Sequence, residues 1–106
     1  MSIKNERTVE VIKDLAAKFL TYEGNKSSLI TVTSLNMSKD GKRCTIFFTV
    51  FPETLQKTAL EFAKRKRSEF KKYVQNNSKL GRIPFMDFEI DMGEKNRQKI
   101  DELLNG

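Results

Sequence analysis

The sequence predicts a small α+β domain in which a three-stranded mixed sheet carries all its helices on one face. Three observations predict it. Apolar residues recur at helical spacing in two segments, three other segments are rich in β-branched and aromatic residues, and no Pro- or Gly-rich linker divides the chain. At 106 residues the chain has the length of one domain, and we expect residues 1–106 to form it.

The first element is expected to be a helix near Asn5–Tyr22. Its apolar residues follow the i, i+3, i+4, i+7 and i+8 positions of a single stripe, namely Ile12, Leu15, Ala16, Phe19 and Leu20. Gly24 and Asn25 end the helix, because Gly readily takes the left-handed backbone conformation that follows a helix C-terminus.

A β-hairpin is expected next, with strands at Leu29–Met37 and Arg43–Phe51. The turn between them contains Gly41, which can take a positive φ. The second strand is apolar on both faces, which is typical of a central strand, so it should lie between the other two. Its Phe47 and Phe51 share the face opposite the main apolar row, and we interpret them as core or partly exposed packing residues rather than a base-stacking platform.

The apolar alternation slips within the first strand. Ile30 and Val32 share one face, whereas Leu35 and Met37 fall on the other. This offset indicates either a β-bulge or a strand that is partly covered on both faces.

A long helical segment follows Pro52, which suits a first helical turn because its missing N–H would be unpaired there. Its apolar stripe consists of Leu55, Ala59, Phe62, Ala63, Phe70, Tyr73 and Val74. Lys66 falls in the middle of this stripe, where a buried ammonium would be costly. Either Lys66 reaches solvent or the helix breaks near residues 63–66, and we favour the break.

After a loop at residues 75–81, a third strand is expected at Ile83–Asp91, with its apolar side chains inward. Pro84 cannot donate to a ladder, which favours an edge position. The tail Glu94–Leu104 is expected to form a short amphipathic helix or a docked arm.

The outward residues of this strand and the tail are acidic: Asp87, Glu89, Asp91 and Glu94. Charge on an edge strand deters edge-to-edge pairing. A divalent-metal site is the less favoured interpretation, because such sites need converging oxygen ligands and not a linear row. We therefore expect no metal here.

Composition excludes several kinds of chemistry. The chain has no His and one Cys, so a His-based triad, a His metal site, an intrachain disulfide and a Cys-rich metal site are all excluded. No apolar run approaches the roughly 18 residues of a membrane span, and residues 1–10 lack the core of a secretory signal. We expect a cytoplasmic protein without a cofactor, a membrane partner or a small-molecule substrate.

Positive charge is concentrated in one part of the chain. The net charge is +6, and residues 61–82, with eight cations and two anions, carry +6 by themselves, whereas residues 83–106 carry −3. Clustered cations attract phosphate, so the segment indicates nucleic-acid binding, although a solvated helix face remains the alternative. The candidate RNA-binding residues are Lys64, Arg65, Lys66, Arg67, Lys71, Lys72, Lys79 and Arg82.

Four of these residues should face a ligand. On a helical wheel Lys64, Arg65, Lys71 and Lys72 lie away from the apolar stripe. A Gly-x-x-Gly loop, which would clamp phosphates with the backbone, occurs nowhere in the chain. Side-chain charge must then supply the contacts, which predicts recognition of folded RNA by shape and phosphate.

The element order is the type II KH arrangement, and the chain resembles the ribosome-binding factor A family of bacterial small-subunit assembly factors. The resemblance covers nearly the whole chain and is carried by residues 29–38, Val50-Phe51, Arg67-Ser68-Glu69-Phe70, residues 82–88 and residues 99–104. In place of that family's Ala-x-Gly, this chain has Ala63-Lys64-Arg65.

The resemblance implies a monomeric, non-catalytic factor that binds the small (30S) ribosomal subunit and its 16S rRNA. It implies a role in late maturation and in processing of that rRNA. The alternative is a general KH-like nucleic-acid-binding module, or a ribosome accessory protein, with a different RNA target. An enzyme is a distant third, since no nucleophile–base pair or phosphate loop is visible.

Overall fold

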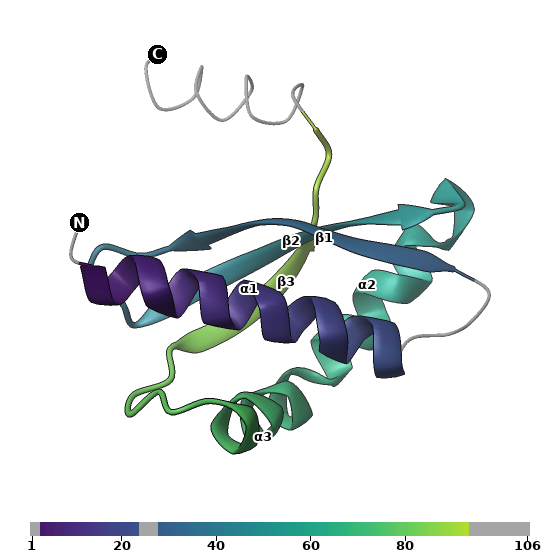
Figure 1. Cartoon of the computed structure of the whole chain (residues 1–106). Helices are drawn as coiled ribbons and strands as arrows, with labels where there is room; N and C mark the ends of the chain where they lie inside the picture. The colour runs from purple at the N-terminus through teal and green to yellow at the C-terminus, as the bar shows by residue number, and fades with distance from the viewer. Residues whose placement is uncertain (1–2, 24–27, 94–106) are drawn as a thin grey trace, which may run out of the picture.

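The computed structural model describes residues 3–23 and 28–93, and it confirms the predicted α+β class (Figure 1). Three strands form one sheet, and the helices lie together on one of its faces. The elements are α1 (Ile3–Glu23), β1 (Leu29–Met37), β2 (Arg43–Phe51), the 3₁₀ turn η1 (Glu53–Leu55), α2 (Gln56–Arg65), α3 (Arg67–Asn77) and β3 (Phe85–Ile90).

The sheet has the order β1-β2-β3, so the prediction of a central second strand is confirmed. β1 pairs with β2 antiparallel, and β3 pairs with β2 parallel. The two hairpin strands have their predicted limits, whereas the third is shorter than the predicted Ile83–Asp91. Pro84 directly precedes β3, which is an edge strand as expected.

A β-bulge explains the slipped alternation of β1. The register shifts between Val32 and Ser34, so Thr33 is an extra residue. Beyond the bulge, Leu35 and Met37 lie opposite buried residues of β2 and pack against the core. The bulge interpretation is therefore confirmed: the extra residue turns Leu35 and Met37 back to the core-facing side that Ile30 and Val32 share.

The core lies between the sheet and the helices. Its buried apolar side chains are Ile12, Leu15, Ala16, Phe19, Leu20, Cys44, Ile46, Phe48, Val50, Ala59, Ala63, Phe70, Val74, Met86 and Phe88. All five residues of the predicted α1 stripe are among them. Among the described residues, no polar or charged side chain is fully buried.

Aromatic rings join the sheet to the two helices that cross it. Phe48 packs on Phe88 at 6.3 Å between ring centroids, and Phe88 packs on Phe70 at 5.4 Å. Phe70 contacts Phe19 at 5.2 Å, and Phe19 contacts Tyr73 at 5.4 Å. Such tilted pairs stabilise beyond the apolar area they bury, so this row fixes α1 and α3 relative to the sheet.

The helical segment breaks at Lys66, as predicted. Lys66 has φ −93° and ψ 8°, and its N–H reaches the carbonyl oxygens of Phe62 and Ala63. These angles lie in a region open to any L-residue, so no Gly is needed at the break. Among the described residues, positive φ is found only at Gly41 and Gly93.

The helix ends differ slightly from the predicted ones. The second helical segment begins as a 3₁₀ turn after Pro52, and α3 continues to Asn77 through the start of the predicted loop. The predicted tail element Glu94–Leu104 lies outside the described residues. No described helix has the length and apolar character needed to cross a membrane.

Candidate nucleic-acid interface

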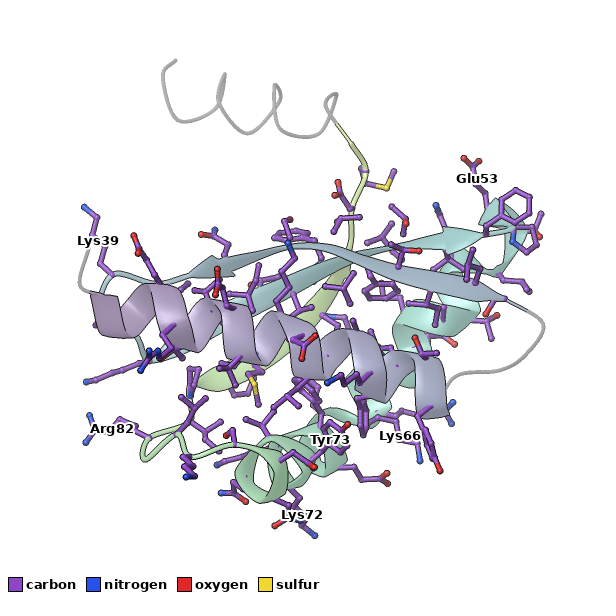
Figure 2. The ribbon with its side chains drawn as sticks, in the orientation of Figure 1. Lys39, Glu53, Lys66, Lys72, Tyr73 and Arg82 are labelled. Atoms are coloured by element: carbon purple, nitrogen blue, oxygen red, sulfur yellow. The ribbon has the colours of Figure 1, made fainter. Side chains whose placement is uncertain are left out.

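Five of the eight predicted RNA-binding cations are exposed and project outward. They lie at the end of α2, along α3 and in the loop before β3: Arg65, Lys71, Lys72, Lys79 and Arg82. Within residues 3–23 and 28–93, none of these side chains has an ion-pair or hydrogen-bond partner. Lys72 and Arg82 extend from the side of the molecule away from the sheet (Figure 2). We call these five residues the basic ridge.

Two other predicted cations are bound by carboxylates of the edge strand. Lys64 Nζ lies 3.2 Å from Asp87 Oδ1 and 3.1 Å from Glu89 Oε1, and Arg67 Nη1 lies 3.2 Å from the same Asp87 oxygen. The helical wheel placed Lys64 away from the apolar stripe, but a wheel does not show which element lies beside that face. In the structure α2 packs beside β3, whose carboxylates bind Lys64.

The protonation equilibria of this cluster favour the charged forms. Burial lowers the pKa of Lys64, but hydrogen bonds to Glu89 and Asp87 outweigh it and leave the pKa raised. Burial raises the pKa of Asp87, but the N–H of Phe88 and the interaction with Lys64 outweigh it and leave that pKa lowered. Both groups are therefore ionised near neutral pH.

Arg67 links the break to the sheet. Its Nε donates to the carbonyl of Lys64 at 3.0 Å, which satisfies an end group of α2. Its guanidinium carbon lies 5.8 Å from the ring centroid of Phe85, at the start of β3. Arg67 therefore holds α2, α3 and β3 together.

Lys66 reaches solvent from the apolar stripe at the break itself. Its Nζ pairs with Glu69 at 3.2 Å and lies 5.8 Å from the ring centroid of Phe62. Both solutions predicted for this residue, the break and the outward-reaching side chain, are therefore present.

The side chains of the acidic row of β3 are bound by other residues of the chain. Within the part of the chain described, no group of three or more potential metal ligands converges. Asp87 and Glu89 bind Lys64, and Asp91 accepts a hydrogen bond from the bulge residue Thr33 at 2.5 Å. Sequence reasoning missed this pairing, although the opposite net charges of residues 61–82 and 83–106 signalled it.

The remaining candidate residues contribute no reactive group. Cys44 is buried in β2, and burial raises the pKa of its thiol to about 12, so the thiolate is disfavoured. Phe47 is half-buried and Phe51 is 72% exposed at the end of β2.

The fold and the basic ridge together define a KH-like α+β domain that lacks the Gly-x-x-Gly loop and presents its cations on a broken helix and in the loop that follows it. The chain belongs to the ribosome-binding factor A family, whose model matches residues 4–104. A curated relative, the ribosome-binding factor A of Magnetococcus marinus, is 27% identical over 110 residues, covering 100% of this chain and 89% of the relative.

Solved structures share the fold. The crystal structure of ribosome-binding factor A from Thermus thermophilus matches with a TM-score of 0.70 at 20% identity, covering 81% of this chain and 94% of that one. The solution NMR structure of a Thermotoga maritima protein, described as a candidate ribosome-binding factor A, matches with a TM-score of 0.68 at 21% identity. That match covers 85% of this chain and 89% of the other.

Proposed function

We propose that this protein is a non-catalytic RNA-binding assembly factor for the small (30S) ribosomal subunit, supporting late maturation and processing of 16S rRNA. The observation that carries the proposal is the basic ridge, a set of exposed cations without partners among the described residues, on a chain of this family. We infer that residues 1–106 act as one domain and as a monomer in the bacterial cytoplasm, without a metal or cofactor.

The proposed contacts are electrostatic. Ridge side chains meet phosphates and release condensed counterions, which supports affinity without reading base edges. Preferential binding to one rRNA conformation shifts the folding equilibrium toward it, because a ligand stabilises the state it binds more tightly. No chemical step is required.

The eight predicted cations divide into two roles under this proposal. The basic ridge contacts phosphate. Lys64, Lys66 and Arg67 set the geometry of the break that presents the ridge, since each already has an acidic partner. Neutralising a ridge residue should weaken RNA binding, whereas neutralising one of these three should mainly lower stability.

Deletion of the gene in its host, grown at low temperature, tests the function. Free small subunits containing unprocessed 16S rRNA should accumulate, because misfolded RNA states persist longer in the cold. The wild-type gene should restore the normal profile. A variant with Arg65→Glu, Lys71→Glu and Lys72→Glu should not.

A matched control reverses three exposed cations elsewhere, with Lys39→Glu, Lys42→Glu and Lys57→Glu. It has the same net charge and should restore the profile. Normal subunits and normal rRNA ends in the deletion strain would contradict the proposal, and would favour the KH-like module with a different RNA target.

A further inference from the structure

An open groove lies on the surface between α1 and α3, the helix that carries Lys71 and Lys72. Its walls are formed by Ala17, Lys18, Thr21 and Tyr22 of α1 and by Tyr73 of α3. The α1 residues are spaced i, i+1, i+4 and i+5, so they form one face of the helix. The groove is thus built from two aromatic rings, a methyl group, a hydroxyl and the stem of a lysine.

The two tyrosines in this groove differ in how firmly they are held. Tyr73 is half-buried and ends the row of packed rings that runs back through Phe19 and Phe70 to the sheet. Tyr22 is 90% exposed. An aromatic ring has a large apolar area, and removing that area from water is favourable. A ligand that covered the exposed ring of Tyr22 in this groove would therefore gain binding free energy.

Cations lie near the groove. Lys72 directly precedes Tyr73 in α3 and is exposed, and Lys66, which pairs with Glu69, lies at the break before that helix; Figure 2 labels these three side chains. Lys18 pairs with Asp14 at 3.1 Å, but both side chains are more than 60% exposed. Such solvent-exposed pairs contribute little, so Lys18 exchanges this partner readily for a phosphate.

We propose that this groove binds an unpaired RNA base, stacked on the exposed ring of Tyr22. The inference rests on the proposed function and adds a second kind of contact to it. A strand whose phosphates lie along Lys71 and Lys72 passes beside the groove, so a base turned inward meets the rings. The charge around the groove favours a polyanion over an apolar peptide, and stacking accepts any base because every base has a π-face.

Intrinsic fluorescence reports on this site alone. The chain has two Tyr and no Trp, and both Tyr residues line the groove. Titration with a short single-stranded RNA of mixed sequence should quench the tyrosine emission. An abasic strand of equal length supplies the same phosphates without bases, and should bind through the ridge while leaving the emission unchanged.

Substitution of Tyr22 provides the second test, because its exposed ring contributes little to the core. Tyr22→Leu should weaken single-stranded RNA binding by roughly fivefold to a hundredfold, the range expected for one stacked base. Tyr22→Phe should bind as the wild type does. Phe51→Leu, which removes an exposed ring at the far end of β2, is the matched control and should also bind normally.

The outcomes separate this inference from the proposed function. Equal quenching by the abasic strand, or full affinity in Tyr22→Leu, would overturn the base site and leave phosphate binding intact. Salt-dependent RNA binding that leaves the tyrosine emission unchanged would also overturn the base site and leave phosphate binding intact. Absence of binding to any RNA, including small subunits, would overturn both proposals.

Discussion

At the scale of single residues, Asp87 fastens the helix break to the sheet. Its carboxylate accepts hydrogen bonds from Lys64, from Arg67 and from the backbone N–H of Phe88. The side chain is 28% exposed, so these interactions are less screened than those of surface pairs. Asp87 therefore determines how firmly α2 and α3 are held against the edge strand.

Replacing Asp87 with Asn keeps an acceptor for Phe88 and removes the charge that pairs with Lys64 and Arg67. We expect Asp87→Asn to lower the free energy of unfolding by about 1 kcal/mol at neutral pH, measured by urea denaturation. Asp14→Asn is the matched control. It removes the exposed pair with Lys18 and should change stability by no more than about 0.5 kcal/mol. Equal effects would contradict the account.

The difference in stability between the wild type and Asp87→Asn should depend on pH. The folded-state pKa of Asp87 is lowered from 3.8, so its stabilising contribution is complete above that value and is lost as pH falls through the folded pKa. The pKa of Lys64 is raised from 10.5, so its contribution is complete below that value and is lost as pH rises through the folded pKa. The stability gap between wild type and Asp87→Asn should therefore persist at neutral pH and close in strong acid. A gap that widens below pH 3.8 would contradict this assignment.

At the scale of secondary-structure elements, the break between α2 and α3 forms without glycine. Lys66 turns the chain with negative φ, and the carbonyl of Lys64 is capped by Arg67. Ala63, fully buried one turn earlier, supplies a small side chain where α2 approaches the core. Side-chain contacts therefore stabilise a bend for which the sequence offers no flexible residue.

The geometry of the break predicts the effect of restoring the family's Ala-x-Gly. Arg65→Gly should be less stable than Arg65→Ala by about 1 kcal/mol, because residue 65 is helical and Gly loses more backbone entropy there. Urea denaturation of the two variants measures the difference with the same cation removed from both. Greater stability of the glycine variant would show that the break requires a backbone geometry other than the one described.

Local patterns made most of the elements predictable. The α1 stripe, the hairpin and the break at Lys66 each depend on residues close together in the chain. The slipped alternation of β1 left two interpretations open, and only its pairing with β2 decides for the bulge that turns Leu35 toward the core. The pairing of Lys64 with Asp87 joins residues 23 positions apart, and it exists only once β3 lies beside α2.

At the scale of the whole molecule, the exposed cations are separate from the apolar core between the sheet and the helices. The helices cover one face of the sheet, and the basic ridge consists of exposed cations at the end of α2, along α3 and in the loop that follows. The acidic edge of β3 binds Lys64 and Arg67, Glu69 binds Lys66, and the ridge has no ion-pair partner among the described residues. Sequence alone identified the basic segment, but only the fold divides it into paired and unpaired residues.

The salt dependence of binding to purified small subunits tests the central claim most directly. Reversing Arg65, Lys71 and Lys72 to Glu takes the net charge from +6 to 0, and so does reversing Lys39, Lys42 and Lys57. Three lost phosphate contacts should reduce the slope of log K against log salt by about 2 in the ridge variant. The control variant should keep the wild-type slope. Equal slopes in all three proteins, or equal losses in both variants, would contradict a phosphate-binding ridge.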